Sequence, residues 1–170
     1  MKRIVFLFIF IVLMGAGALA LMRASGEHER AQAPVIPRFA SFRSNEANMR
    51  TGPGTRYPIE WVFRAQGMPV EIIGQDDEDI WRHVRDTDGD EGWIHKTELS
   101  SKRSGVVTGG MHDLMQANDG TPGVAAHMQP GAVGKLISCG HEWCRMRFGD
   151  VKGYLRKSEF WGAYPDEIFD

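Results

Sequence analysis

The stretch Gly92-Trp93-Ile94-His95-Lys96-Thr97-Glu98-Leu99 returns later in the chain, with conservative changes, as Gly153-Tyr154-Leu155-Arg156-Lys157-Ser158-Glu159-Phe160. Glycine, aromatic, aliphatic, basic, lysine, hydroxyl, glutamate and large apolar residues recur in the same order. A match over eight consecutive positions indicates an internal repeat, and a repeat of this length marks a supersecondary unit used more than once. We therefore expect one small structural unit that occurs twice.

The region around the first copy has the pattern of an all-β unit. Turn signals separate short apolar stretches of strand length, which lie at 59–63, 70–73, 81–85 and 92–95. The sequence Gly52-Pro53-Gly54 predicts a tight turn, because proline presets φ and glycine supplies the positive φ of a type II turn. Residues 96–99 are expected to form one helical turn.

The second copy closes a region with the same order of parts. Strands are expected at 132–139, 143–148 and 151–155, whereas 111–128 gives a weaker signal. The polar run 118–123 lies where the first region has its Gly-Pro-Gly turn. No window has ten or more residues of helical periodicity, so the sequence predicts an all-β fold class.

The N-terminal residues have the pattern of an export signal. Lys2 and Arg3 precede an apolar run, and Ala18-Leu19-Ala20 fits the small-x-small cleavage pattern. We predict a signal peptide over 1–20. Because residues 4–22 carry no charge, an uncleaved membrane anchor that extends to about residue 22 is the alternative. In both cases the rest of the chain is exported, and 21–38 is expected to be a linker.

The charge of the chain is distributed unevenly. The whole sequence has 20 Lys and Arg residues and 22 Asp and Glu residues. Residues 39–100 contain 7 basic and 12 acidic residues, whereas residues 101–162 contain 8 basic and 5 acidic residues. An asymmetry of charge affects which partners a protein associates with, and it does not determine the fold. The excess of basic residues in 101–162 is too small to indicate binding to nucleic acid, and the predicted export signal also argues against a nucleic-acid partner.

The first region resembles a bacterial SH3-like domain. The resemblance begins with the run Asn48-Met49-Arg50-Thr51-Gly52-Pro53-Gly54-Thr55-Arg56-Tyr57-Pro58-Ile59. It continues through Gly67-Met68-Pro69-Val70-Glu71-Ile72-Ile73, Trp81, Val84, Gly92-Trp93-Ile94 and Leu99. The second region is similar at Pro130-Gly131, Val133, Trp143, Gly153-Tyr154-Leu155 and Phe160, but it lacks the Arg-x-Gly-Pro-Gly loop. The closing Trp161-Gly162-Ala163-Tyr164-Pro165 resembles exported tandem members of the family in Gram-negative bacteria.

The resemblance implies two tandem SH3-like β-barrels, at 39–102 and 103–162, followed by an acidic tail at 163–170. It also implies a protein of the periplasm, and the alternative is anchoring in the inner membrane through the uncleaved N-terminal segment alone. The expected activity is non-catalytic binding of cell-wall peptide or of an envelope protein, with no cofactor. The loop that the second region lacks puts equal ligand binding by both units in question.

Alternation along the expected strands places aromatic and cationic side chains on one face of each unit. In the first unit these are Trp81, His83, Arg85, Trp93 and His95, and in the second unit they are Trp143, Arg145, Arg147, Tyr154 and Arg156. One interpretation is a groove that stacks a ligand on the aromatic rings and holds its carboxylates with the cations. In the other interpretation, the aromatic rings close the barrel ends or the contact between the units, and the cations are solvated.

Cys139 and Cys144 flank a short turn that is typical of a hairpin. Residues that face each other across a hairpin can meet disulfide geometry, and export provides an oxidising compartment. We therefore predict a disulfide. A metal site with His141 would lack a fourth ligand, and a nucleophilic cysteine would lack a base and a following helix.

The run from Asp86 to Glu91 superficially resembles a calcium loop. It lacks the spaced distal glutamate and the flanking helices, so we interpret it as a solvated hairpin turn and expect no metal. No Ser–His–Asp arrangement is evident, and we predict that the protein is not an enzyme. An adaptor for an envelope complex and a part of, or accessory to, a cell-wall hydrolase are the alternative functions.

Overall fold

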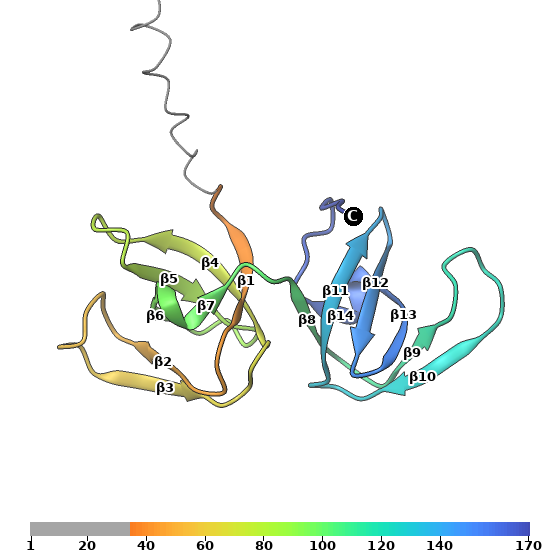
Figure 1. Cartoon of the computed structure of the whole chain (residues 1–170), viewed down its shortest axis with the longest axis horizontal. Coiled ribbons are helices and arrows are strands. Elements are labelled where there is room, and N and C mark those ends of the chain that lie inside the picture. The colour runs from red at the N-terminus through yellow and green to blue at the C-terminus, as the bar shows by residue number, and fades with distance from the viewer. Residues whose placement is uncertain (1–34) are drawn as a thin grey trace, which may run out of the picture. The chain divides into compact units, whose positions relative to one another are not determined.

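The fold of residues 35–170 is described here from a computed structural model (Figure 1). The expected signal or anchor segment, at 1–20 or to about residue 22, lies outside the described residues, as does most of the expected linker. Strands dominate the described part of the chain, and its helical content is two single 3-10 turns. Within residues 35–170 no helix is long and apolar enough to cross a membrane.

The first barrel is a seven-stranded antiparallel sheet with the order β3-β2-β6-β5-β4-β1-β7. Its elements are β1 (Arg38–Phe42), β2 (Ala47–Arg50), β3 (Ile59–Phe63), β4 (Pro69–Gln75), β5 (Trp81–Arg85), β6 (Glu91–His95), η1 (Lys96–Glu98) and β7 (Leu99–Ser100). The four strands and the helical turn that the sequence predicts in this region are therefore confirmed.

The second barrel repeats this topology seven strands later, with the order β10-β9-β13-β12-β11-β8-β14. Its elements are β8 (Ser104–Val107), β9 (His112–Met115), β10 (Val124–Met128), β11 (Val133–Cys139), β12 (Trp143–Phe148), β13 (Val151–Arg156), η2 (Lys157–Glu159) and β14 (Phe160–Trp161). The prediction of an all-β chain built from two tandem SH3-like barrels is confirmed.

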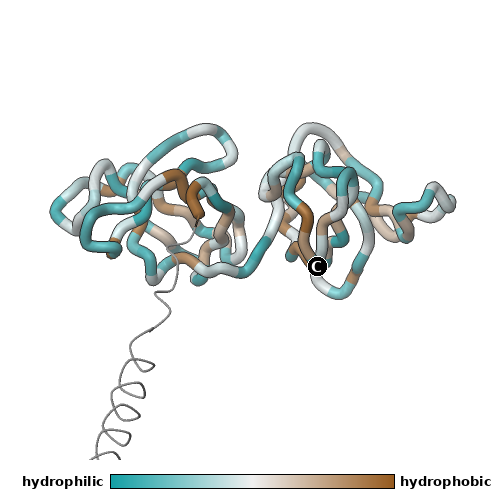
Figure 2. Tube along the Cα trace, turned by 90° about the horizontal axis from the view of Figure 1, so that it is seen from above, coloured by the Kyte–Doolittle hydropathy of each residue, from teal (hydrophilic) through white to brown (hydrophobic). Residues whose placement is uncertain are grey.

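Each barrel is filled by the inward side chains of its strands, as the two-residue period of a strand requires. Hydrophobic and hydrophilic stretches alternate along the chain in both barrels (Figure 2). The same core positions are occupied twice, by the pairs Ile72 and Leu136, Val84 and Met146, Ile94 and Leu155, and Leu99 and Phe160. Each such side chain contributes roughly 1.5–3 kcal/mol by its burial.

The glycine that opens each repeated phrase is required by close packing. A Cβ at Gly92 would lie 2.5 Å from Cγ of Met49, and a Cβ at Gly153 would lie 2.5 Å from the backbone oxygen of Met115. Neither glycine has a positive φ, so glycine is favoured here by the lack of space for a Cβ and not by the backbone conformation. Close packing of the neighbouring strands at this position therefore favours glycine.

Matching registers make the positions of the two barrels directly comparable. The pairing of β4 with β5 shifts between Ile72 and Gly74, and the pairing of β11 with β12 shifts between Leu136 and Ser138. The pair Glu71 and Arg85 therefore corresponds to the pair Lys135 and Arg147. In the same way, Gln75 and Arg82 correspond to Cys139 and Cys144.

The predicted disulfide is present, and it joins Cys139 to Cys144 across the hairpin of β11 and β12. The two residues are direct cross-strand partners, with Cα atoms 4.0 Å apart. Both side chains are buried in the core of the second barrel. The bridge therefore fixes the register of the hairpin beside its turn. Disulfides are typical of proteins that reside outside the cytoplasm.

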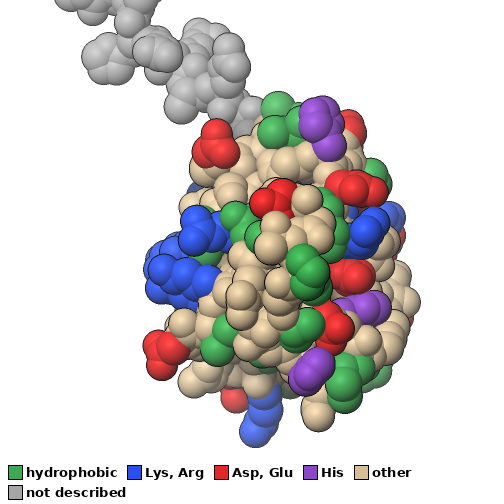
Figure 3. All heavy atoms as spheres, turned by 90° about the vertical axis from the view of Figure 1, so that its right-hand side faces the viewer, with side chains coloured by type: hydrophobic (Ala, Val, Ile, Leu, Met, Phe, Trp, Pro, Cys, Tyr) green, Lys and Arg blue, Asp and Glu red, His purple; other side chains and the backbone are tan. Residues whose placement is uncertain are grey.

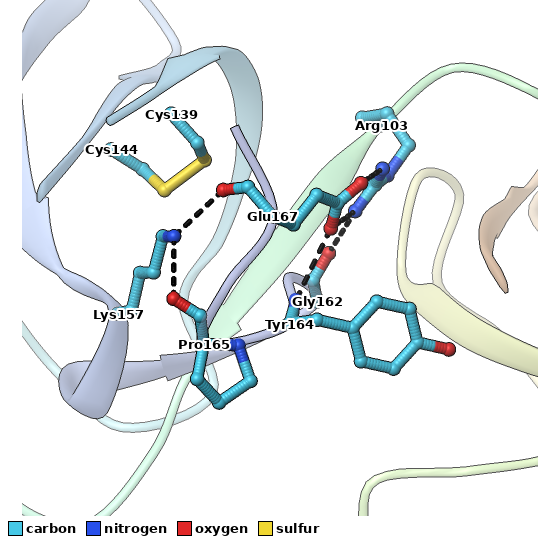
Figure 4. Close-up of a disulfide and its surroundings, with 8 residues drawn as sticks. All are labelled: Arg103, Cys139, Cys144, Lys157, Gly162, Tyr164, Pro165 and Glu167. Carbon is cyan, nitrogen blue, oxygen red and sulfur yellow. Dashed lines mark hydrogen bonds and ion pairs between the residues drawn. A yellow bond between two sulfur atoms is a disulfide. The ribbon is translucent and has the colours of Figure 1, made fainter. Parts of the chain in front are cut away.

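The residues after β14 contact the second barrel through Arg103 and Lys157 (Figure 4). The Arg103 guanidinium donates to both carboxylate oxygens of Glu167 and, at 2.8 Å, to the carbonyl of Gly162. Lys157 Nζ donates to the carbonyls of Pro165 and Glu167 at 2.8 and 2.7 Å. The hydrogen bond from Arg103 holds the pKa of Glu167 below its usual value. We call residues 163–170 the C-terminal segment.

Candidate ligand-binding face

The predicted site residues lie on β5 and β6 of the first barrel and on β12 and β13 of the second. Trp81 is opposite His95 and His83 is opposite Trp93. At the equivalent positions Trp143 is opposite Arg156 and Arg145 is opposite Tyr154. We call these surfaces the first face and the second face. Each face brings together the residues that strand alternation assigned to it.

The aromatic side chains of the first face contact one another. Trp81 is only 8% exposed and meets the ring of His95 edge to face, with centroids 5.3 Å apart. His83 stacks on Trp93 with centroids 4.9 Å apart and planes inclined by 18°. Trp81 is therefore buried, and the half-buried rings of His83, Trp93 and His95 are each already in contact with another ring.

Arg85, the cation predicted for the first face, is held between two carboxylates. Its guanidinium donates to Glu91 Oε1 at 2.7 and 2.9 Å and to Glu71 Oε2 at 3.3 Å. The bond to Glu91, more than any other contact, raises the pKa of Arg85 above its usual value. Glu71 also accepts a hydrogen bond from the Tyr164 hydroxyl at 2.8 Å. The charges of the first face are thus neutralised within the protein.

The second face leaves its cations open to solvent. The Arg156 guanidinium lies 4.6 Å from the ring centroid of Trp143 and pairs with Glu142 at 3.4 Å. Arg145 and Arg147 are exposed, and neither forms an ion pair or a side-chain hydrogen bond with any residue in the range 35–170. The half-buried rings of Trp143 and Tyr154 lie in the same surface.

Sequence reasoning missed two further cations of the second face. Lys135 and Lys152 are the cross-strand neighbours of Arg147 on either side, and both are exposed. Their equivalents in the first barrel are Glu71 and Glu91. A position-by-position alignment of the two repeats would have revealed this double reversal of charge.

The second face therefore carries five exposed basic residues and one paired acidic residue. The set is Lys135, Arg145, Arg147, Lys152, Arg156 and Glu142. Like charges on neighbouring strands repel one another, and a bound anion would relieve that repulsion. A group of Lys and Arg side chains is visible at the left edge of the space-filling view in Figure 3. The arrangement is suited to stacking a ligand and binding its carboxylates.

A nucleophilic cysteine, a metal site and a calcium loop were the other chemical interpretations considered for residues of this chain. Both cysteines of the chain form the disulfide, so neither is a thiolate ligand or a nucleophile in this state. Residues 35–170 contain no group of three His, Cys, Asp or Glu side chains that could hold a metal ion. Asp86 Oδ1 accepts from the backbone N–H groups of Asp88 and Asp90, both at 2.9 Å, and closes a hairpin turn.

The fold defines a pair of small SH3-like barrels, which is an architecture of binding modules. A family model described as the bacterial SH3 domain matches residues 43–101 and 114–162. The chain belongs to the bacterial SH3 domain family and carries two copies of the domain in tandem.

No curated protein sequence matches this chain. Among solved structures, NlpC1 from Trichomonas vaginalis is 12% identical, over 78% of this chain and 48% of that chain, with a TM-score of 0.34. An NlpC/P60 endopeptidase from Photobacterium damselae subsp. piscicida is 11% identical, over 77% of this chain and 35% of that chain, with a TM-score of 0.34. This chain thus spans less than half of either protein, and likeness at this level carries no argument about function.

Proposed function

We propose that the protein is a non-catalytic binding protein of the bacterial cell envelope and that its second face binds carboxylate-bearing cell-wall peptide. The observation that carries this proposal is the group of five exposed cations around Trp143 and Tyr154. Cell-wall stem peptides present carboxylates on a short, flexible chain. The guanidinium groups bind the carboxylates, and the two rings pack against the aliphatic parts of the peptide.

The two barrels have unequal roles in this proposal. Trp81, His83, Arg85, Trp93 and His95 form a face whose rings and charges are occupied within the barrel. The second face therefore provides the binding energy, and the first barrel acts as a spacer or as a separate recognition module. The export signal and the disulfide agree with work in the periplasm, where the cell wall lies.

The test is retention of the purified protein on purified cell wall at a fixed ionic strength. The variant Arg145→Ala/Arg156→Ala is expected to lose at least about tenfold in affinity, because two charge-assisted contacts disappear. His83→Ala/His95→Ala changes the equivalent positions of the first barrel and is the matched control, which is expected to bind normally. Unchanged retention of the Arg145→Ala/Arg156→Ala protein would refute the proposal, and release of wall fragments by the wild-type protein would refute its non-catalytic part.

An adaptor role is a second candidate, and the edge strand β3 supports it. Ile59, Trp61 and Val62 are exposed on this strand, and Trp61 is 51% exposed. An exposed apolar edge is a surface to which another protein can add a strand. Co-purification of one envelope protein that is lost with Trp61→Ala, but kept with Arg145→Ala/Arg156→Ala, would favour the adaptor.

A further inference from the structure

A cationic cavity of about 330 Å³ lies in the first barrel, apart from the first face. Four basic side chains line it, namely Arg38 of β1, Arg43 just after β1, Arg82 of β5 and Lys96 of η1. Arg82 alternates with Trp81 and His83 along β5, so it is directed to the opposite side of the strand from the first face. We call this cavity the arginine pocket.

The positive charge of the arginine pocket is only partly neutralised. The side chain of Arg82 is 9% exposed and contacts Asp79 at 2.6 Å, and Lys96 shares the same carboxylate at 3.1 Å. Arg43 donates only to the backbone carbonyl of Leu99, at 3.0 and 3.2 Å. Among residues 35–170, Asp79 is thus the one carboxylate that pairs with the four cations, and only Arg82 and Lys96 contact it.

Arg38 is the least satisfied of the four. Among residues 35–170 it has no acidic partner, and its Nε is buried without a hydrogen bond. Burial lowers the pKa of Arg38, and the nearby positive charges of Arg82 and Arg103 lower it further. The Nε of Arg103 is also buried without a hydrogen bond although its guanidinium binds Glu167, so the feature that distinguishes Arg38 is the lack of an acidic partner. A partly buried charge without a counter-charge is costly, and an anion would relieve that cost.

The second barrel shows what occupies the equivalent position. Arg38 lies opposite Ile72 in the ladder of β1 and β4, and the backbone carbonyl of Arg103 binds the amide of Leu136, the equivalent of Ile72. Arg103 is therefore the counterpart of Arg38, and Lys157 is the counterpart of Lys96. Both counterparts bind the C-terminal segment, through the side chain and the backbone of Glu167 (Figure 4).

The backbone of the C-terminal segment also extends the second sheet. Phe169 exchanges two backbone hydrogen bonds with Cys139, of 2.7 and 3.0 Å, at the end of β11, where β8 provides no partner. Gln75 holds this position in the first barrel, at the end of β4 beyond the last residue that β1 pairs. In the first barrel, the chain after β7 continues through Lys102 and Arg103 into β8, so no segment of residues 102–170 turns back to cover the pocket.

We propose that the arginine pocket binds an acidic peptide segment in trans, in the way that the second barrel binds residues 163–170. The ligand is a peptide in which a carboxylate is followed two positions later by an aromatic side chain, as Glu167 is followed by Phe169. The carboxylate pairs with Arg38, Lys96 donates to the peptide backbone, and the aromatic residue adds to the edge of β4 at Gln75. The positive pocket and the acidic segment are complementary in charge.

The probe for this site is a fluorescent peptide with the sequence of residues 163–170, titrated into the full-length protein and followed by anisotropy. The copy of this segment in the chain keeps the second-barrel site filled, because its effective concentration is about millimolar or higher. The added peptide therefore does not compete for that site, and variants distinguish binding at the arginine pocket from binding at the second face. Saturable binding is expected, with at least a tenfold loss in Arg38→Gln/Lys96→Gln. The control Arg145→Gln/Lys152→Gln removes the same charge from the second face and is expected to bind normally.

A charge exchange makes the test independent of folding defects. The Arg38→Glu protein is expected to reject the original peptide and to recover binding to a peptide that carries lysine at the position of Glu167. The absence of saturable binding, equal affinity in Arg38→Gln/Lys96→Gln and the wild-type protein, or failure of the lysine peptide to bind Arg38→Glu would overturn the proposal. Displacement of the peptide by inorganic phosphate as effectively as by unlabelled peptide would also overturn it, because the pocket would then recognise a bare anion.

Discussion

The first and second faces are built on the same strands in the same register, yet their charges are opposite at two positions. In the first barrel Arg85 lies between Glu71 and Glu91, whereas in the second barrel Arg147 lies between Lys135 and Lys152. The inward residues between them remain apolar in both barrels. The surface charge of this fold can therefore change without a change of its core, because alternate residues of one strand point to the surface and to the core.

A second contrast lies at the turn end of the two equivalent hairpins, β4 with β5 and β11 with β12. Gln75 and Arg82 of the first barrel correspond to the disulfide pair of the second. Arg82 lines an open cationic cavity, whereas the cysteines underlie a surface that the C-terminal segment covers. This end of the first barrel thus has an open cavity, whereas the second barrel closes the equivalent end with a disulfide and with residues 163–170.

The largest expected effect comes from giving the second face the charges of the first. In Lys135→Glu/Lys152→Glu, Arg147 gains two carboxylate neighbours, and its charge is no longer available to an anionic ligand. We expect cell-wall affinity to fall about 100-fold, which corresponds to the loss of two charge-assisted contacts, while thermal stability is retained.

The control for this exchange is Arg64→Glu/Lys102→Glu, which changes the net charge equally at exposed positions off the second face. Retention on the purified wall at two ionic strengths separates the two proteins. An equal loss in both would mean that overall charge, and not the arrangement around Arg147, controls binding.

Removal of the disulfide tests whether the second barrel depends on a covalent link that the first lacks. Because the bridge closes a loop of only a few residues, Cys139→Ala/Cys144→Ala is expected to lower the free energy of unfolding by about 2 kcal/mol. Amide hydrogen exchange should accelerate at Leu136 and Leu155 and stay unchanged at Ile72 and Ile94. Equal acceleration in both barrels would show that they unfold together.

The repeated glycines provide a smaller and more local comparison. Gly153→Ala places a methyl group against the backbone oxygen of Met115, whereas Gly92→Ala first meets the flexible side chain of Met49. Overpacking of this kind costs about 1–3 kcal/mol, and we expect Gly153→Ala to be the more destabilising by about 1 kcal/mol in thermal unfolding. The reverse order would show that the second barrel adjusts its backbone more easily than the first.

Much of the architecture was predictable because it depends on local periodicity. The repeat beginning at Gly92 and Gly153 indicated two units, and alternation placed Trp143 and Arg145 on the face opposite Met146. The hairpin around His141 predicted the disulfide. Each of these inferences needs only the two-residue period of a strand and the short span of a turn.

The parts that sequence reasoning missed depend on contacts between distant strands. Lys135 joins the second face only because β11 pairs with β12 across a shift in register. Arg38 and Arg82 line one pocket although three strands, β2, β3 and β4, separate them in sequence. The acidic tail gave no sign that Glu167 would bind Arg103.

By itself, the amino-acid sequence of this protein determined its duplication, its strand content, the residues that point inward and the cysteine pair, since these follow from neighbours a few positions apart. Tertiary structure alone decided which cations are neutralised and which stay free, because a charge is satisfied by whatever side chain the sheet brings beside it. Arg85 and Arg147 are alike in local pattern, and only their cross-strand neighbours place one between two carboxylates and leave the other exposed and without an ion pair among residues 35–170.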